Sequence, residues 1–423
     1  MALFPIAIPK AHSLTGRITL SLLRAAFHAV QRNRGAAGID RVSVKMFAAN
    51  LDENLQALLR DLKDGSFCPF PLRRQFIPKE PGKFRPLGIP AVRDRVAQEA
   101  LRRLLNPIFE RLFHDASYGF RQGRNCHQAL LKVLELHRAG FQVILDADIK
   151  GFFDNLPHEV ILEAVAAQVA DGNILRLIQK FLRSGVMEQG VFKPTTVGTP
   201  QGGVISPLLA NIVLNHLDWK LHNQGYRLVR YADDFVVLCQ TQTQAEEALR
   251  LVHQTLGELG LSLSSEKTQI TTYGKGYAFL GFVLSKRSRR MRDKSKRKFQ
   301  EKIRQLSVRS HNLDSERIAK LNRVIQGTAR YFGTRWSTVR WCFRALDSWI
   351  RRRVRCLKFK RFSYHHNRRM RTKQLAQLGL LSLESFCLAA GRVARPSYVK
   401  EPLNPNPPRV SKHWLEFSDD ARG

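Results

Sequence analysis

The sequence predicts an α+β fold with antiparallel strands, followed by a basic helical region. Before residue 285, helical patterns alternate with short runs of apolar and β-branched residues. Residues 228–238 form one such run with a polar interruption, which is typical of two antiparallel strands joined by a turn. After residue 285 the composition shifts toward Lys and Arg, and this shift suggests a domain boundary.

The individual elements follow from the local sequence. Residues 92–113 have the period of a helix, in which Pro107 marks a kink or a break. Residues 141–149 are rich in apolar and β-branched residues and predict a strand. Residues 155–170 open with an Asn cap candidate and an early Pro, so a helix should begin there. Residues 199–221 run from a glycine-rich turn into another helix.

The charge of the chain predicts a polyanionic partner. Its 423 residues include 70 Lys and Arg against 35 Asp and Glu, a formal net charge of +35. Basic side chains gain affinity for nucleic acid by displacing counterions from phosphates. The sequence has no run of about 18 apolar residues and no hydrophobic leader after Met1, so a membrane partner is not expected.

The six cysteines are scattered, and no two of them form a CxxC pair. This spacing argues against a zinc module and against a disulfide framework. We therefore expect reduced thiols in a cytoplasmic protein.

Most of the net positive charge lies in residues 286–373, which hold 30 Lys and Arg against five Asp and Glu. Inside this region an apolar stripe at helical spacing predicts an amphipathic helix, formed by Val339, Phe343, Leu346, Ile350, Val354 and Leu357. Four arginines fall largely off the stripe and predict a nucleic-acid-binding face, with plain solvated surface as the alternative: Arg344, Arg351, Arg352 and Arg355. Trp336, Trp341 and Trp349 are interpreted as core residues.

Two adjacent aspartates, Asp233 and Asp234, interrupt the apolar run RYADDFVVLC at residues 230–239. A tight turn there would hold both carboxylates at the tip of a β-ribbon. Carboxylates are natural ligands of Mg²⁺, which shares its coordination shell with substrate phosphates. Asp is also common in turns for its own hydrogen bonds, so a purely structural turn is the alternative.

A second source of carboxylates is the strand expected at residues 141–149. Its alternation places Asp146 and Asp148 on one face and apolar residues on the other. Three aspartates converging from two strands would suit a pair of metal ions about 3.5–4 Å apart. The spacing alone does not choose between Asp146 and Asp148.

Seven sequence blocks then support a family resemblance. The chain resembles, from about residue 33 to about residue 400, the reverse transcriptases encoded by bacterial group II introns, especially compact ones without an endonuclease domain. The blocks occur in the order of that family: IPKEPGKFRPLGIPAVRDRVAQEAL (77–101), SYGFRQGRNCHQAL (117–130), DADIKGFFDNLPH (146–158), GTPQGGVISPLLANIVL (198–214), RYADDFVVL (230–238), LSSEKT (263–268) and YAFLGF (277–282).

The resemblance implies a right-hand polymerase fold and its domain limits. Fingers and palm, with an antiparallel sheet, would occupy residues 51–285 after an N-terminal extension at residues 1–50. A basic α-helical thumb or maturase domain would occupy residues 286–373, before a C-terminal segment and tail at residues 374–423. Because the chain ends near residue 423 and lacks cysteine pairs, we do not expect nuclease activity. The bacterial cytoplasm would be its location.

The family pattern also implies the metal ligands. The metal-binding carboxylate stands four and five residues before paired aromatics, which here are Phe152 and Phe153, and it is therefore Asp148. Asp233 would be the second shared ligand and Asp234 a less strictly bound one, while Asp146 would be structural. Two Mg²⁺ ions are implied, with Mn²⁺ as a substitute.

Further residues match family positions that contact the nucleotide. Lys79 and Arg85 match positions that grip the triphosphate. Phe153 matches the ring that closes over the sugar and excludes a 2′-hydroxyl, although a plain core aromatic is the alternative. The other matched nucleotide-binding positions are Ile149, Gln201 and Gly202.

Two more positions are matched. Lys267 corresponds to a lysine near the departing pyrophosphate and would act as a general acid. The segment YAFLGF, with Gly281, would form the primer grip and contact nucleic acid.

The function implied is RNA-directed DNA synthesis from dNTPs on a DNA or RNA primer. The template would be RNA, with group II intron RNA as the expected partner, whose splicing the maturase region would assist. Alternatives are a domesticated relative acting in DNA repair or phage defence, and an RNA-binding splicing factor with a decayed polymerase. An RNA-dependent RNA polymerase is disfavoured by Phe153. The sequence makes no prediction of oligomeric state.

Overall fold

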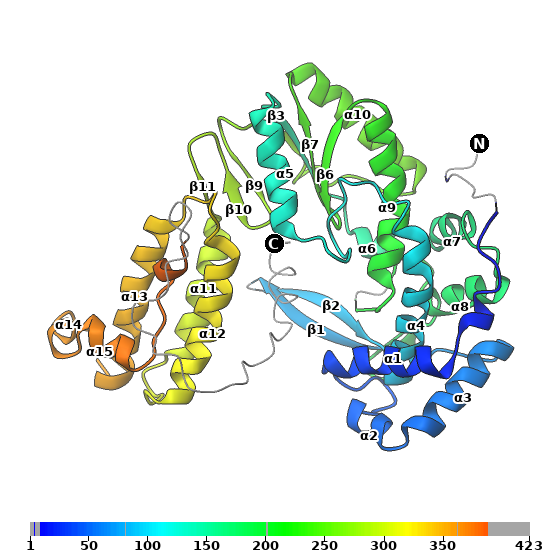
Figure 1. Cartoon of the computed structure of the whole chain (residues 1–423), viewed down its shortest axis with the longest axis horizontal. Coiled ribbons are helices and arrows are strands. Elements are labelled where there is room, and N and C mark those ends of the chain that lie inside the picture. The colour runs from blue at the N-terminus through cyan, green and yellow to red at the C-terminus, as the bar shows by residue number, and fades with distance from the viewer. Residues whose placement is uncertain (1–3, 5–8, 81, 200–201, 362, 388–423) are drawn as a thin grey trace. The chain divides into compact units, whose positions relative to one another are not determined.

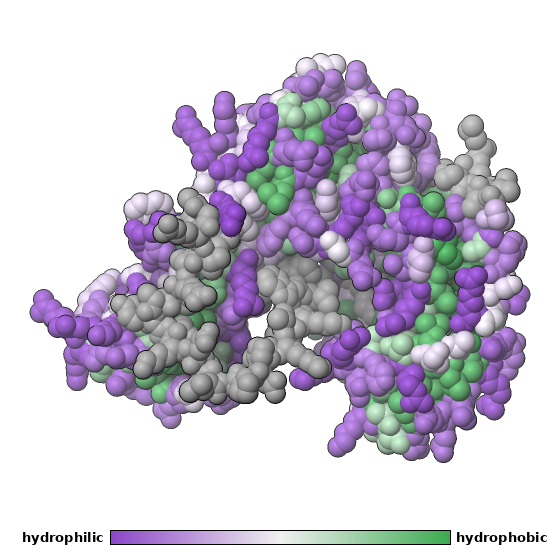
Figure 2. Space-filling model, in the orientation of Figure 1, coloured by the Kyte–Doolittle hydropathy of each residue, from purple (hydrophilic) through white to green (hydrophobic). Residues whose placement is uncertain are grey.

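The computed structural model describes residue 4 and residues 9–80, 82–199, 202–361 and 363–387 (Figure 1). The chain divides into two compact units, residues 1–271 and residues 272–423. No helix within these described ranges is both long and apolar enough to cross a membrane. On the face shown in Figure 2, the surface is mostly hydrophilic.

The first unit, drawn from blue to green in Figure 1, mixes helices with two four-stranded sheets. Its helical elements are η1 (Thr15–Arg17), α1 (Leu20–Arg32), α2 (Val44–Ala49), α3 (Leu51–Asp64), α4 (Val92–Phe109), α5 (Cys126–Arg138), α6 (Phe152–Asn155), α7 (His158–Ala166), α8 (Gly172–Leu182), α9 (Ser206–Asn223) and α10 (Gln242–Glu258). Its strands are β1 (Leu72–Glu80), β2 (Lys83–Ile89), β3 (Val143–Ala147), β4 (Val186–Glu188), β5 (Val191–Lys193), β6 (Arg227–Tyr231), β7 (Asp234–Cys239) and β8 (Gln269–Thr272).

The two sheets have different strand orders. One has the order β2-β1-β4-β5, in which β1 and β2 form an antiparallel hairpin. The other has the order β6-β7-β3-β8, and β7 pairs antiparallel with both β6 and β3. The predicted strand at 141–149 and the strand–turn–strand at 228–238 are therefore neighbours in one sheet.

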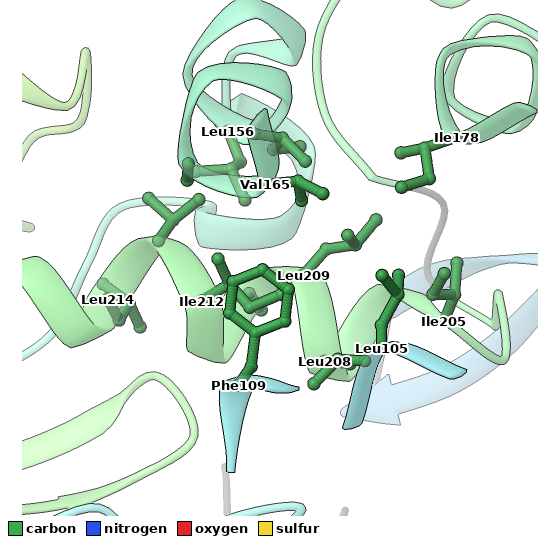
Figure 3. Close-up of a cluster of buried hydrophobic side chains, with 14 of the residues drawn as sticks. Leu105, Phe109, Leu156, Val165, Ile178, Ile205, Leu208, Leu209, Ile212 and Leu214 are labelled. Carbon is green, nitrogen blue, oxygen red and sulfur yellow. The ribbon is translucent and has the colours of Figure 1, made fainter. Parts of the chain in front are cut away.

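The main hydrophobic core lies on one face of this second sheet. Alternate side chains of β3 and β7 point into that core: Val143, Leu145, Ala147, Phe235, Val237 and Cys239. Figure 3 shows a part of the core in which side chains of α9 meet those of α4 and α7. Helix α10 packs on β3 and β7, and α5 and α9 contact β6. Three helices thus pack against strands of this sheet.

Two helix boundaries differ from the sequence prediction. Helix α4 continues through Pro107 and ends at Phe109, because the Glu110 amide still donates to the Asn106 carbonyl at 2.8 Å. Helix α7 begins at His158 with Pro157 as its N-cap, so the expectation that Asn155 caps it is wrong. Asn155 instead ends the short helix α6, and its side-chain amide donates to the Lys150 carbonyl at 2.9 Å.

The second unit, drawn from yellow-green to orange in Figure 1, combines a small sheet with helices. Its strands β9 (Tyr277–Phe279), β10 (Phe282–Leu284) and β11 (Arg289–Met291) have the order β11-β10-β9. Its helical elements are α11 (Asp293–Leu306), α12 (Ser315–Phe332), α13 (Arg340–Phe359), α14 (His366–Arg369), α15 (Thr372–Gln377) and η2 (Glu384–Phe386).

The hairpin of β9 and β10 belongs to this second unit. Its two-residue turn consists of Leu280 and Gly281, which both have positive φ (46° and 77°), as a type I′ turn requires. The Tyr331 hydroxyl of α12 donates to the Leu280 carbonyl at 2.9 Å. The chain divides at Thr271/Thr272, before this hairpin, whereas its composition changes near residue 285.

Helix α13 shows the amphipathic pattern expected from the sequence. All six apolar residues of the predicted stripe are buried: Val339, Phe343, Leu346, Ile350, Val354 and Leu357. Trp341, however, is 77% exposed, so its interpretation as a core residue is wrong. It lies in the first turn of the helix, between positions of the stripe, and its ring lies against the guanidinium of Arg344.

Candidate active site

The paired aspartates lie at the tip of the β6–β7 hairpin. Tyr231 and Asp234 form the last pair of the two strands, so Ala232 and Asp233 make a two-residue turn. Ala232 has φ of 60° and is buried, and the Oδ1 atom of Asp233 is also buried. A turn this short restricts the main chain at Asp233 and thereby the direction in which its side chain leaves the backbone.

The strand pairing also distinguishes Asp148 from Asp146. The last pair between β3 and β7 is Ala147 with Phe235, and Asp148 follows directly. Asp148 therefore lies at the end of β3 that is next to the hairpin turn. Asp146 lies further from that end, opposite Val236, and accepts a hydrogen bond from Gln269 Nε2 at 3.4 Å.

Lys267 contacts the carboxylate of Asp148. Its Nζ lies 3.1 Å from Asp148 Oδ2. The main chain of the same segment is attached as well, because the Ser264 amide donates to the Asp148 carbonyl at 2.8 Å, and the Asp148 amide donates to Thr268 Oγ1 at 3.4 Å. The segment LSSEKT thus brings a cation to the end of β3.

The donor set fits a divalent cation bound by few protein ligands. Within the described ranges, no three His, Cys, Asp or Glu side chains come together in a way that could hold one ion. The predicted arrangement of three aspartates around a pair of ions stays a prediction, and in this structure Asp148 Oδ2 contacts Lys267 Nζ. Mg²⁺ is commonly bound by one or two carboxylates together with waters and substrate phosphates, and Asp148 and Asp233 can supply such carboxylates.

The expected triphosphate-binding residues are on the β1–β2 hairpin. Lys79 lies in β1, at the irregularity between Pro78 and Glu80. Arg85 lies in β2 opposite Ile77 and is half-buried.

The glycine-rich turn before α9 approaches this hairpin. Gln201 lies outside the described residues. Gly202 has φ of 114°, and a Cβ there would stand 2.3 Å from the Gly88 carbonyl oxygen in β2. Only glycine allows this close approach.

Phe153 and Ile149 both have buried side chains. Phe153 is 8% exposed, belongs to the main core, and its carbonyl accepts from the Thr199 amide at 2.7 Å. Ile149 is 4% exposed and forms a β-bridge with Leu263. A contact of Ile149 with nucleotide would therefore involve its main chain.

In the second unit, the four predicted arginines have different surroundings. Arg344 is exposed, and its guanidinium donates to the Glu384 carboxylate at 2.7 Å. Arg351 is half-buried, and Arg352, also half-buried, donates to the Tyr364 hydroxyl at 3.0 Å.

The prediction that Arg355 belongs to a nucleic-acid-binding face is wrong. It is 6% exposed, and its Nε donates to the Met370 carbonyl at 2.8 Å. The chain after α13 folds back over this position, which periodicity within α13 does not reveal.

Comparison with known proteins decides the family. Residues 77–284 match the family "Reverse transcriptase (RNA-dependent DNA polymerase)", and residues 296–375 match "Group II intron, maturase-specific domain". Protein YkfC of Escherichia coli K12 is 34% identical, over 67% of this chain and 83% of YkfC. The chain belongs to the group II intron-encoded reverse transcriptase and maturase family.

Other relatives of this reverse transcriptase are longer. The group II intron-encoded protein LtrA of Lactococcus lactis is 33% identical, over 55% of this chain and 49% of LtrA. This chain therefore spans about half the length of LtrA. Among solved structures, a chain of the "Partial Cas6-RT-Cas1--Cas2 complex" is 24% identical, with a TM-score of 0.36 over 56% of this chain and 40% of that chain.

The matches confirm the predicted family, the α+β fold class and the enzyme class, an RNA-directed DNA polymerase with a maturase domain. The reverse transcriptase match contains Asp148, Asp233 and Lys267. The maturase match contains α13 together with α14.

The sequence did not reveal the residues that hold the hairpin turn of this reverse transcriptase. A Cβ on Gly119 would stand 2.3 Å from the Ala232 amide nitrogen, so Gly119 packs directly on the turn. Arg230, Asp218 and Asn211 form a buried hydrogen-bonded group beside it. Asn211 and Asp218 stand seven positions apart in α9, which is one face of a helix, and this spacing was the available signal.

Proposed function

We propose that this protein copies RNA into DNA with Asp148 and Asp233 as the ligands of divalent metal ions. The observation that carries the proposal is the strand register. Asp148 comes directly after the last residue pair of β3 with β7, and Asp233 lies in the turn directly before β7. Asp234, the first residue of β7, would be a less strictly bound ligand.

The reaction is nucleotidyl transfer. The 3′-hydroxyl of the primer attacks the α-phosphorus of a dNTP, a new phosphodiester bond forms, and pyrophosphate leaves. Two Mg²⁺ ions, or Mn²⁺ in their place, would lower the pKa of the attacking hydroxyl and neutralise charge on the leaving group. Lys267 would donate a proton to the pyrophosphate, and it is near enough to Asp148 to act at the same site.

Residues outside the palm carboxylates would bind the nucleotide. Lys79 and Arg85 of the β1–β2 hairpin would bind the triphosphate, because fixed positive charge offsets charge that develops during phosphoryl transfer. Phe153 would exclude the 2′-hydroxyl of a ribonucleotide. The main chain around Ile149 and Gly202, together with Gln201, would complete the nucleotide site.

The domain limits follow the same proposal. An N-terminal extension would end near residue 50, and fingers and palm would occupy residues 51–285. Residues 286–373 would be the thumb or maturase domain, followed by a C-terminal segment at residues 374–423.

Residues 286–373 would bind RNA. This region carries most of the net positive charge of the chain. Arg344, Arg351 and Arg352 of α13 would contact phosphates, and Gly281 of the β9–β10 turn would support the primer grip. The partner we propose is group II intron RNA, in the cytoplasm of a bacterium. The matched domains favour neither the domesticated repair enzyme nor the decayed splicing factor.

The test is cDNA synthesis by the full chain on a primed RNA template. Asp233→Ala and Asp148→Ala should each abolish DNA synthesis and leave RNA affinity unchanged. Asp146→Asn is the matched control, since Asp146 is a neighbouring carboxylate that the proposal does not place on the metal. Full synthesis by the Asp233→Ala variant would falsify the metal assignment. Sequencing of RNA that copurifies with the protein tests the partner, because a structured intron is expected and mixed cellular RNA would contradict it.

A further inference from the structure

Strand β6, which leads into the hairpin turn, carries one partner of a completely buried ion pair near its end. Arg230 of β6 and Asp218 of α9 are both 0% exposed. Arg230 Nε donates to Asp218 Oδ1 at 2.7 Å, and Arg230 Nη2 donates to Asp218 Oδ2 at 2.5 Å. This two-point contact fixes the plane of the guanidinium group as well as its position.

The remaining nitrogen of the same guanidinium reaches the turn itself. Arg230 Nη1 donates to the Ala232 carbonyl at 2.9 Å and to Asn211 Oδ1 at 2.9 Å. The Asn211 amide group in turn donates to the Gly119 carbonyl at 2.9 Å. Gly119 packs against the Ala232 amide, so the network reaches the turn from two directions.

The conformation of the turn explains why such support matters. Two-residue hairpin turns with positive φ at the first central position generally have Gly, Asn or Asp there. This turn has Ala232 with φ of 60°, a conformation that is strained for alanine. The Ala232 carbonyl belongs to the peptide unit that leads into Asp233. A donor that holds this carbonyl holds the orientation of that peptide unit. It therefore also sets the direction in which the Asp233 side chain leaves the main chain.

Stability alone does not explain this arrangement. Removing two charges from water is costly, and apolar side chains of similar volume often stabilise a core as well or better. What apolar side chains cannot supply is a donor for the Ala232 carbonyl. We propose that Arg230, oriented by Asp218 and Asn211, is a positioning residue that sets the direction of the Asp233 carboxylate. This inference rests on the proposed role of Asp233 as a metal ligand.

The decisive variant removes both charges and keeps the volume: Arg230→Met combined with Asp218→Leu. Its RNA affinity should stay close to that of the wild type, and its unfolding temperature should fall only by what the Ala232 and Asn211 oxygens lose with their donor. On a poly(rA) template with an oligo(dT) primer, kcat should fall about 10²-fold, as expected for a displaced catalytic group. The Mg²⁺ concentration for half-maximal rate should rise, because the carboxylate no longer points correctly. A merely structural role would not move this concentration.

A matched control is Glu99→Gln in α4. The Glu99 side chain is also buried, and it binds Arg102 at 2.7 Å, but both residues lie in one helix and neither contacts the turn. This variant should lose stability without a change in Mg²⁺ requirement. Should the double variant not fold, Arg230→Lys answers the same question, since it keeps the charge and loses the two-point contact with Asp218 that orients the donor to Ala232.

Two results would overturn the inference. One is a folded variant with wild-type kcat and Mg²⁺ dependence. The other is a loss of kcat that matches the loss of folded protein, with the Mg²⁺ requirement unchanged. Asp233→Ala, measured beside it, separates this proposal from the one it rests on. If Asp233→Ala is fully active, the metal assignment fails, and if only the Arg230 variants are normal, the positioning role alone fails.

Discussion

Lys267 Nζ lies 3.1 Å from Asp148 Oδ2, so a cationic side chain contacts the carboxylate that would bind a divalent metal. Both groups are partly open to solvent, with the Lys267 side chain 60% exposed and that of Asp148 32% exposed. An exposed ion pair of this kind contributes little to stability. Under the proposed function, Lys267 would either compete with metal for Asp148 or carry out proton transfer beside it.

Substitution of Lys267 distinguishes these two roles. If Lys267 donates the proton to pyrophosphate, Lys267→Ala should lower kcat for nucleotide incorporation about 10²-fold or more at saturating Mg²⁺. Lys267→Arg, which keeps the charge, should bind dNTP normally and recover only part of the rate. Single-turnover incorporation measures both. If Lys267→Ala keeps full kcat and merely needs less Mg²⁺, the lysine is a competitor for Asp148 and not an acid.

The contact between Gly119 and the hairpin turn predicts a steric effect. A Cβ at Gly119 would stand 2.3 Å from the Ala232 nitrogen, which is a main-chain atom that cannot rotate away. Gly119→Ala should therefore destabilise the protein by about 1–3 kcal/mol, as overpacking does, and raise the Mg²⁺ requirement. Urea unfolding and a Mg²⁺ titration of DNA synthesis measure these effects.

Gly257→Ala is the control for that substitution. Gly257 lies in helix α10, and a Cβ there would meet nothing within 4 Å. Its replacement should stabilise the protein by up to about 1 kcal/mol through helix propensity. Normal stability of Gly119→Ala would mean that the turn can move away, and the proposed rigidity would be wrong.

Local periodicity predicted faces of elements well. The alternation that placed Asp146 and Asp148 together appears in the structure as two half-buried residues between the buried residues Leu145, Ala147 and Ile149. Such patterns depend only on the repeat of the element itself, so they can be read from a sequence.

Periodicity could not predict contacts between distant segments. The alternation in residues 141–149 did not choose between Asp146 and Asp148, and their different distances from the hairpin turn depend on the register of β3 with β7, two strands that are far apart in the chain. Arg355 is covered by the segment around Met370, and Trp341 is left uncovered by its surroundings. Neither outcome follows from the period of α13.

Phe153 should control sugar selection. The whole residue is 8% exposed, so at most an edge of its ring is accessible. If that edge excludes a 2′-hydroxyl, Phe153→Val should reduce the preference for dNTP over rNTP by at least about tenfold. The ratio of kcat/KM values for dTTP and UTP measures it.

Phe152→Leu is the control for Phe153, because its ring lies 5.2 Å from that of Phe153 and is also buried. Both variants should lose some core stability. An unchanged dTTP/UTP ratio in Phe153→Val, with the same loss of stability as in Phe152→Leu, would make Phe153 a core residue only.

Asp94 should make stability depend on pH. Burial raises the pKa of Asp94 from 3.8 to about 6, although its carboxylate accepts the Phe70 amide at 2.9 Å. Between these two values the folded state binds more protons than the unfolded state, so stability is lost as pH rises through about 6. Asp94→Asn keeps the acceptor without the charge and should therefore be more stable than the wild type at pH 7.5, by up to about 3 kcal/mol.

The comparison at two pH values is the decisive measurement. At pH 5 the stability difference between Asp94→Asn and the wild type should be clearly smaller than at pH 7.5. Urea unfolding at both pH values gives the two differences. A variant that is less stable than the wild type at pH 7.5 would show instead that ionised Asp94 is held by Arg93, whose Nε lies 3.5 Å away.

Trp341 should contact RNA by stacking. It is 77% exposed in the basic second unit, and the Arg344 guanidinium carbon lies 4.9 Å from the centroid of its ring. Glu384 holds that guanidinium at 2.7 Å, so the ring and its cation are already oriented. Stacking of an unpaired base on an aromatic ring contributes about 1–3 kcal/mol, so Trp341→Ala should weaken binding of single-stranded RNA about five- to 150-fold.

The controls separate stacking from charge. Trp341→Phe keeps an aromatic ring and should therefore bind single-stranded RNA nearly as well as the wild type. Trp341→Ala should bind duplex RNA nearly as well as the wild type, because paired bases do not offer a free face. Glu384→Gln should weaken binding less, since it releases Arg344 without removing the ring. Equal losses for single-stranded and duplex RNA in Trp341→Ala would contradict stacking, and they would indicate that the substitution disturbs the positively charged surface around Arg344.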